Sequence, residues 1–256
     1  MSKSKSVVTN FRQTESPQDS VLVEIYRCLF DRYGPQHWWP ADEPFEVMVG
    51  AILTQSTAWT NVEKAIRNLK EARVLGPSSL RSLEPEELAS LIKPSGYYHV
   101  KAKKLKALVD WFEKYKDDLH GVIALDANRL RSDLLKVYGI GEETADSILL
   151  YAAEKPVFVI DAYTRRIIDR IGITPLERSY DGYQRLFMDN LPQNAAWFNE
   201  YHALLVQHGK TTCRKHPVCQ ICCLQEICHS GISYTGRNAR KPPVKTKQPA
   251  SGQVTC

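Results

Sequence analysis

Hydrophobic residues recur at intervals of three and four positions along most of the chain. Between Val21 and Tyr33 the apolar side chains fall on one side of a helix, and Gly34 follows as a typical C-terminal stop. Proline and acids at residues 84–87 mark the start of a short helix that ends before Pro94. The same periodicity predicts helices over residues 45–53, 60–73, 101–115, 129–137, 142–152, 162–171, 180–190 and 196–207. The strand-like run 157–160 has no visible partner, so the pattern predicts an all-α fold.

Polar ends flank this helical part. Residues 1–18 are rich in Ser and Lys, and residues 231–256 carry five cations, three prolines and no acid. We expect a disordered lead-in over 1–18 and a flexible basic tail over 231–256. The chain has a net charge of +5, but its ends carry +7, which leaves −2 for residues 19–230. Net charge therefore gives no argument that the folded part binds nucleic acid.

Membrane and secretory classes are disfavoured by the sequence. No stretch approaches the roughly 18 uninterrupted apolar residues of a membrane span, and the first 20 residues lack the apolar segment of a secretory signal. We expect no membrane association and a location in the cytoplasm. Five of the seven cysteines lie within residues 213–228. Such crowding favours a metal or cluster site over a disulfide framework.

A glycine-rich turn connects two of the predicted helices within residues 134–145. Gly139 and Gly141 permit a tight turn with positive φ, and Ile140 between them can fill the gap between the helices. The turn leaves backbone N–H groups free at the start of the second helix, where phosphate binds readily. An ordinary helix–helix turn would also use glycine. Thr144-Ala145 and the apolar frame favour phosphate binding, which makes Gly139, Gly141 and Thr144 candidate DNA contacts.

Asp161 stands directly after the apolar run 157–160 and before a predicted helix. Aspartate is among the best N-cap residues and requires no other role there. A carboxylate at the edge of an apolar wall is also suited to stay ionised and to face a developing positive charge. Position alone leaves both interpretations open.

Four cysteines form the pattern Cys213-x5-Cys219-x2-Cys222-x5-Cys228, which is typical of a four-thiolate site. Zinc sites of this kind usually combine two Cys-x2-Cys pairs separated by a longer loop. One such pair flanked by single cysteines better suits a [4Fe-4S] cluster. Zinc remains the alternative, and Cys223 is a possible substitute for Cys222.

The hairpin, Asp161 and the cysteine pattern together resemble, in the same order, the helix-hairpin-helix DNA glycosylases of the endonuclease III superfamily. The resemblance covers residues 20–230 or so and implies a two-lobed fold with a C-terminal four-cysteine iron-sulfur loop. Residues 44–155 would form a helical bundle with the hairpin, and residues 19–43 with 156–230 the second lobe. Duplex DNA containing a damaged base would lie between the lobes, and Asp161 would be the catalytic carboxylate.

One position departs from the family pattern. Bifunctional members carry a Schiff-base lysine 18 residues before the aspartate, where this chain has Glu143. A carboxylate cannot form the covalent imine of an AP lyase. We therefore predict a monofunctional glycosylase and expect Glu143 to be an acid in the first turn of a helix.

Three tryptophans resemble the 3-methyladenine DNA glycosylase III branch of the superfamily. In that branch a Trp-Trp-Pro segment, here Trp38-Trp39-Pro40, lines the base pocket, and an aromatic residue at the position of Trp59 stacks on the flipped base. Tryptophans in helical proteins also serve in the core. Flat aromatic walls suit an N-alkylated purine because its positive charge gains a cation–π attraction. The resemblance thus implies hydrolysis of the N-glycosidic bond of an alkylated purine such as 3-methyladenine, in base excision repair.

The resemblance also indicates further DNA contacts. Gln55 matches the glutamine that fills the space vacated by the flipped nucleotide, and residues 95–102 match a loop against the DNA backbone. Lys101, at a helix start where cations are disfavoured, is the expected phosphate contact. We expect a monomer on duplex DNA, associated with the nucleoid. The alternatives are an endonuclease III-like glycosylase for oxidised or mismatched pyrimidines, with or without AP lyase activity, and a non-catalytic DNA-binding module.

Overall fold

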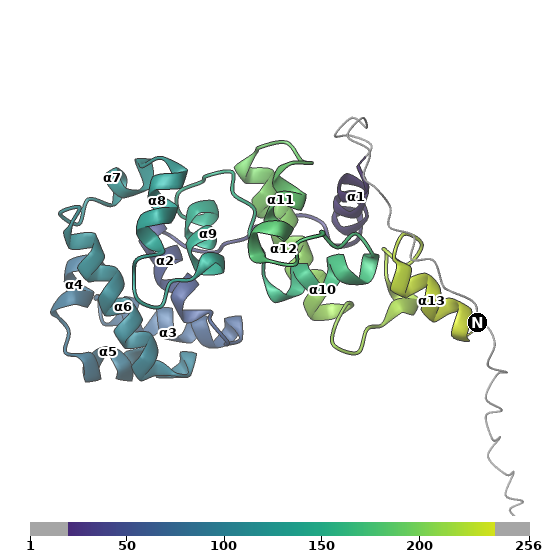
Figure 1. Cartoon of the computed structure of the whole chain (residues 1–256). Helices are drawn as coiled ribbons and strands as arrows, with labels where there is room; N and C mark the ends of the chain where they lie inside the picture. The colour runs from purple at the N-terminus through teal and green to yellow at the C-terminus, as the bar shows by residue number, and fades with distance from the viewer. Residues whose placement is uncertain (1–19, 239–256) are drawn as a thin grey trace, which may run out of the picture.

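The computed structural model describes residues 20–238, with side chains to residue 234, and the regular structure of this part is helical (Figure 1). Its elements are α1 (Val21–Tyr33), α2 (Pro44–Leu53), α3 (Trp59–Glu71), α4 (Pro77–Ser82), α5 (Pro85–Leu91), η2 (Lys93–Ser95), α6 (Tyr98–Glu113), α7 (Leu119–Ala124), α8 (Ala127–Leu134), α9 (Glu142–Tyr151), α10 (Ala162–Ile171), α11 (Tyr180–Met188), α12 (Ala195–Thr211), η3 (Cys219–Ile221) and α13 (His229–Asn238). No strand occurs between residues 20 and 238, so the all-α prediction is confirmed.

The helices lie in two groups in Figure 1. On one side α2 packs against α3, α6 and α9, while α6 also contacts α4 and α5. On the other side α12 packs against α10 and α1, so the first helix of the chain lies with the last ones. α12 also contacts α9, which joins the two groups. None of the helices in residues 20–238 is long and apolar enough to cross a membrane.

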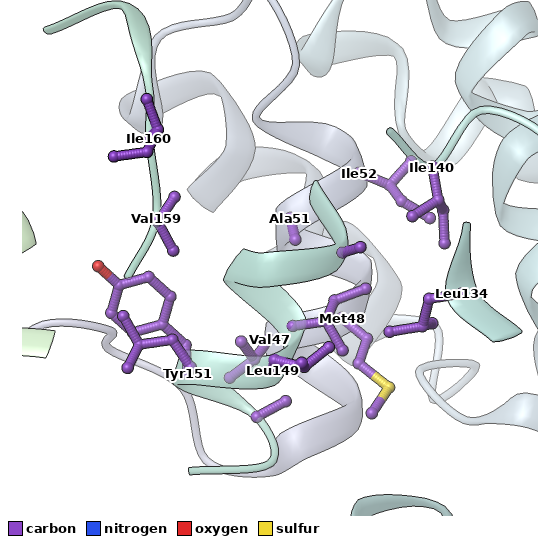
Figure 2. Packing of buried hydrophobic residues seen from close by; sticks show 14 of the residues in the cluster. Val47, Met48, Ala51, Ile52, Leu134, Ile140, Leu149, Tyr151, Val159 and Ile160 are labelled. Atoms are coloured by element: carbon purple, nitrogen blue, oxygen red, sulfur yellow. The ribbon is translucent and has the colours of Figure 1, made fainter. Parts of the chain in front are cut away.

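The core is built around α2, in which every residue from Phe45 to Leu53 is buried. Figure 2 shows Met48 and Ile52 of this helix pointing toward Leu134 and Ile140, the apolar residues around the glycine turn. Ile140 is 5% exposed and fills the space between α8 and α9, as its place between two glycines predicts.

Within the apolar run 157–160, Phe158, Val159 and Ile160 are buried and Val157 is half-buried, and the run belongs to no helix and pairs with no strand in the described chain. A buried extended backbone needs hydrogen-bond partners, and α11 supplies them from its side chains. Gln184 Nε2 donates to the carbonyl oxygen of Phe158 at 2.8 Å, and the N–H of Ile160 donates to the hydroxyl of Tyr180 at 3.3 Å. These bonds hold the segment that leads into Asp161.

A buried ion pair extends this support to α8 and α9. Asp146 has no exposed surface and accepts from Arg131 Nε at 2.7 Å and from Arg131 Nη2 at 3.2 Å. Gln184 Nε2 donates to the same carboxylate at 2.8 Å. Hydrogen bonding to Asp146 raises the pKa of Arg131. One carboxylate therefore joins helices from both groups at the base of the segment before Asp161.

The structure also contains helices that periodicity did not predict. α4 and α7 have six residues each, too few for a repeating apolar face, although Pro77 at the first turn of α4 and the N-cap Asp118 of α7 are start signals. The expected tail over 231–256 is wrong at its start, because residues 231–238 belong to α13. That helix packs against α10 and η3, and its buried Gly231 lies so close to Gln225 that an added Cβ would be 2.9 Å from its carbonyl oxygen. The expected lead-in over 1–18 and the rest of the tail lie outside the described residues.

Candidate active site and DNA-facing loops

Asp161 is the N-cap of α10, and its two carboxylate oxygens have different neighbours. Oδ1 accepts from the backbone N–H of Thr164 at 2.7 Å, and Oδ2 lies 3.9 Å from Nε2 of His202. The side chain is 12% exposed, at the edge of the buried run 157–160. The capping role is therefore present and occupies one oxygen, which leaves the other available for a ligand.

His202 and Tyr151 form a buried pair next to Asp161. Their local sequence does not predict this, since its one unusual feature is a polar residue, His202, within the apolar stretch of α12. The Tyr151 hydroxyl lies 2.5 Å from Nδ1 of His202, across 51 positions of sequence. Both residues are buried. Burial lowers the pKa of His202 despite the nearby Asp161, so the imidazole is neutral at pH 7. Sequence analysis missed both residues because they come from different helices, α9 and α12.

Glu143 in the first turn of α9 lies near the same carboxylate. Although its side chain reaches solvent, the protein atoms around it and then the charge of Asp161 raise its pKa to about 7, against the opposing effect of Arg165. The expectation of a first-turn acid is met. The structure adds that this acid faces the candidate catalytic group.

The three tryptophans of the predicted base pocket form one aromatic cluster. Ring centroids lie 4.9 Å apart for Trp38 and Trp59, 5.0 Å for Trp39 and Trp59, and 5.3 Å for Trp38 and Trp39. The Trp39 ring also lies 5.4 Å from that of Tyr151, and its edge meets Gly50 where a Cβ would be only 3.0 Å away. The cluster therefore adjoins the Tyr151–His202 pair behind Asp161.

An open pocket of about 260 Å³ lies on one side of this cluster. Trp39, Pro40 and Trp59 line it, whereas Trp38 does not. The charged residues of the lining are two acids, Glu46 and Glu63, and two bases, Arg67 and Lys70, of which Lys70 pairs with Glu46 at 2.8 Å. Trp38 instead faces Lys210, whose Nζ lies 5.6 Å from its ring centre. Burial lowers the pKa of Lys210 and the charge of Asp161 opposes that shift, which places this amine beside the site. Lys210 is a third residue near Asp161 that sequence analysis missed.

Gln55 is held against the glycine turn. Its Nε2 donates to the Gly139 carbonyl oxygen at 3.0 Å and to Thr144 Oγ1 at 2.9 Å, and its Oε1 accepts from Lys104 Nζ at 2.5 Å. Three of the predicted DNA contacts, Gln55, Gly139 and Thr144, are thus brought together by direct bonds.

The two glycines of the turn have different conformations. Gly139 has a φ of +83°, the left-handed geometry expected of it, and a Cβ there would lie 2.3 Å from Cγ of Lys104. Gly141 has a φ of −98° and is the N-cap of α9 without any side chain to cap the helix. The first N–H groups of α9 therefore lack a side-chain cap, as an anion site requires.

The expectation that Lys101 contacts phosphate is corrected by its burial. Its side chain is inside the protein, 2% exposed, and Nζ donates to the carbonyl oxygens of Leu53 at 2.8 Å and Ser95 at 2.7 Å. Thr57 Oγ1 donates to the same Ser95 oxygen. Burial, followed by the charge of Lys104, lowers the pKa of Lys101 to about 8. Lys101 thus ties the last residue of α2 to η2, and its buried amine is not available at the surface for a phosphate contact.

The four cysteines of the predicted site line one small cavity. Cys213, Cys219, Cys222 and Cys228 surround it together with Arg170 and His208, while Cys223 does not take part. Arg170 Nη1 lies 3.3 Å from Sγ of Cys213 and donates to it. Burial first, and then the neighbouring thiols, raise the pKa of Cys222 to about 12.

Four cysteines around one cavity, with a cation beside one of their sulfurs, are the donor set that a group held by four thiolates requires. Within residues 20–238 no three His, Cys, Asp or Glu side chains converge on a position for one metal ion.

Comparisons with known proteins agree with the fold and the turn. A family model described as HhH-GPD superfamily base excision DNA repair protein matches residues 49–193. A protein of Methanocaldococcus jannaschii named "Putative DNA repair glycosylase MJ1434" is 42% identical over 82% of this chain and 96% of its own length. Endonuclease III of Thermotoga maritima is 29% identical over 81% of this chain and 92% of its own.

A solved structure of similar fold comes from H. pylori. The crystal structure of its 3-methyladenine DNA glycosylase MagIII, bound to 1,N6-ethenoadenine, aligns with a TM-score of 0.65 at 28% identity. The alignment covers 74% of this chain and 97% of that chain.

Proposed function

The chain belongs to the HhH-GPD superfamily of base excision DNA repair proteins, and we propose that its reaction is the hydrolysis of the N-glycosidic bond of an alkylated purine, without AP lyase activity. Family membership confirms the resemblance to the endonuclease III-like DNA glycosylases and the class of enzyme. The observation that carries the proposal is the free Oδ2 of Asp161 beside the tryptophan cluster.

Asp161 supplies the charge for this reaction. The damaged nucleotide leaves the duplex at a cost of about a few kcal/mol, least for a weakened pair. As the bond to the base lengthens, positive charge develops on the sugar, and a fixed carboxylate at its edge stabilises that charge. Because Oδ1 is engaged by the N–H of Thr164, the carboxylate cannot rotate freely. Oδ2 faces the sugar and positions the water that attacks C1′.

The pocket beside Trp39, Pro40 and Trp59 supports a flat, cationic base. Aromatic faces attract a cation, and this attraction carries the argument, because the two acids of the lining, Glu46 and Glu63, are balanced there by Arg67 and Lys70. 3-Methyladenine carries such a charge while it is bound to the sugar. The H. pylori 3-methyladenine DNA glycosylase of similar fold, solved with bound 1,N6-ethenoadenine, is consistent with this substrate class. We place Trp38 at the border between the pocket and Asp161.

DNA is proposed to lie along the glycine turn, in the cleft between the lobes formed by residues 44–155 and by 19–43 with 156–230, and to bind a single copy of the chain. The uncapped N–H groups after Gly141 bind phosphate, with Gly139 and Thr144 alongside. Gln55 enters the gap left by the flipped nucleotide, which requires release of its bonds to the turn and to Lys104.

Replacement of Asp161 by Asn tests the mechanism. D161N keeps an acceptor for the Thr164 N–H but removes the charge, so excision should be abolished while duplex affinity stays near that of wild type. A panel of duplexes, each with one alkylated, oxidised or mismatched base, measures both quantities. Turnover by D161N would refute the role of the carboxylate.

The same panel decides the second candidate, which the similarity to Endonuclease III of Thermotoga maritima favours. Excision of oxidised or mismatched pyrimidines, with alkylated purines left intact, would assign that activity instead. Excision of 3-methyladenine with competitive inhibition by the free base supports the alkylated-purine proposal.

Absence of lyase activity is proposed from Glu143, which occupies the position of the family's Schiff-base lysine. Borohydride treatment of the enzyme with substrate DNA should trap no covalent adduct, because a carboxylate forms no imine. A trapped adduct would contradict the proposal. Comparison of K210M with K155M would then identify the amine, since Lys210 lies beside Asp161.

The cysteine cavity is proposed to hold a [4Fe-4S] cluster through Cys213, Cys219, Cys222 and Cys228. Such a cluster would cross-link the loop before α13, and base hydrolysis needs no redox step from it. Cys223 offers a matched control because it lies outside the cavity. Purified protein should contain iron and acid-labile sulfide, with loss in C222S and retention in C223S. Zinc without sulfide would overturn the proposal.

A further inference from the structure

One buried polar atom beside Asp161 has no hydrogen-bond partner. Nε2 of His202 is shielded from solvent and unsatisfied, in a residue that is 6% exposed. Its nearest charged neighbour is Asp161, whose Oδ2 lies 3.9 Å away. A buried polar atom left unsatisfied destabilises the folded protein, because it has lost its hydrogen bond to water without gaining another. Such a cost at the edge of an active site indicates a ligand that completes the arrangement.

Tyr151 determines which nitrogen of His202 carries the proton. In the described part of the chain the tyrosine hydroxyl has one partner, Nδ1 of His202. Burial raises the pKa of Tyr151 well above 10, so the hydroxyl stays protonated. It therefore donates a hydrogen bond to Nδ1 of His202. The neutral imidazole then carries its own proton on Nε2. The unsatisfied atom is therefore an N–H donor that lies across from a carboxylate acceptor.

The separation of the two atoms matches that of two groups bridged by one water molecule. At 3.9 Å the separation of Nε2 and Oδ2 exceeds the 2.7–3.2 Å or so of a direct bond. An oxygen placed about 2.8 Å from each atom makes an angle near 90°, which a water molecule tolerates. It would accept from His202 and donate to Asp161. One lone pair and one hydrogen of that water remain free.

We propose that His202 Nε2–H and Asp161 Oδ2 together hold the water that attacks C1′, and that Tyr151 is a positioning residue which orients the imidazole. This inference rests on the proposed glycosylase reaction. The water oxygen forms its bond to C1′ as the bond from C1′ to the base nitrogen breaks. The departing base takes the electron pair of the broken bond, so a purine that was cationic while bound to the sugar leaves as a neutral molecule. The water proton passes to Oδ2 of Asp161.

A pair of substitutions separates the donor from the packing of His202. In H202N the amide reaches the position of Nδ1, which keeps the contact with Tyr151 but removes the donor toward Asp161. In H202Q the amide reaches the position of Nε2 and restores that donor. We expect the single-turnover excision rate to fall about 10- to 100-fold in H202N. H202Q should stay within about fivefold of wild type, and Y151F should lie between the two.

Duplex affinity and melting temperature of each variant show whether the effect is on the chemical step. Both should stay near wild type in H202N, so that the loss lies in the excision rate alone. Equal rates for H202N and H202Q, or a wild-type rate in H202N, would overturn the inference. Where H202N fails to fold, a crystal structure of the wild-type protein decides. A water bonded to both Nε2 and Oδ2 supports the inference, and a direct contact between those atoms overturns it.

Failure of this inference can be distinguished from failure of the proposed function. A wild-type enzyme that excises no base from the panel refutes the proposed function. An active wild type with an inactive D161N and a fully active H202N refutes only the role of His202.

Discussion

Asp146 offers a stringent test of how the fold supports the active site. This carboxylate is completely buried and accepts three hydrogen bonds, two from Arg131 and one from Gln184. Gln184 also donates to the Phe158 carbonyl oxygen, three residues before Asp161. D146N preserves the shape of the side chain, removes its charge and replaces one acceptor oxygen by a donor.

The magnitude follows from the burial of both partners. Removal of one member of a buried ion pair costs about 3–5 kcal/mol. Because the Arg131 side chain is 25% exposed, water compensates part of its charge and the lower end of that range applies. For a chain of this size, about 1 kcal/mol corresponds to roughly 2–4 °C in Tm. D146N should therefore melt about 6–12 °C below wild type.

The control is D117N. Asp117 also binds its arginine, Arg81, through both oxygens, but the two side chains are 28% and 23% exposed. Water reaches the Asp117 carboxylate itself, whereas Asp146 has no exposed surface, so the loss of Asp117 should cost less than that of Asp146, about 1–2 kcal/mol. Thermal unfolding followed by circular dichroism at pH 7 compares the variants, and excision measured well below Tm should fall in D146N alone. A D146N protein that melts no lower than D117N would refute the reasoning.

Three further outcomes follow from the site. K101M leaves the carbonyl oxygen of Leu53 without its buried donor, while Thr57 still donates to that of Ser95, so it should lose about 1–3 kcal/mol of stability. It should nevertheless leave the salt dependence of duplex binding unchanged, because Lys101 makes no phosphate contact; a shallower slope would contradict the correction made above. E143Q should melt close to wild type at pH 5 and above it at pH 8. The pKa of Glu143 rises from 4.5 to about 7 on folding. Ionisation of Glu143 therefore destabilises the folded wild-type protein increasingly from pH 4.5 to about pH 7, and fully above that pH; equal melting temperatures of E143Q and wild type at pH 8 would contradict this. E143K places an amine near Asp161 and should yield a borohydride-trapped adduct with substrate DNA that wild type lacks; no adduct would show that the side chain does not reach C1′.

Local sequence was sufficient for much of the fold. The predicted helices over 21–33 and 162–171 coincide with α1 and α10, because each combines a full apolar face with a stop at Gly34 or Gly172. The tight turn between α8 and α9 was also predictable, because it depends on neighbouring residues, although only Gly139 of its two glycines has the positive φ expected of both. α4 and α7 were missed because six residues are too short to repeat an apolar face.

The features of the candidate site also differ in whether local sequence or tertiary packing determines them. The sequence by itself determined the helices, the turn and the place of Asp161 before α10, because each depends on residues within a few positions of one another. Only the tertiary structure decided that Lys101 is buried, and that Tyr151 and His202 meet beside Asp161. Periodicity records which face of a helix is apolar. Which distant polar atoms then become buried partners depends on how those faces pack, and no single stretch of the chain carries that information.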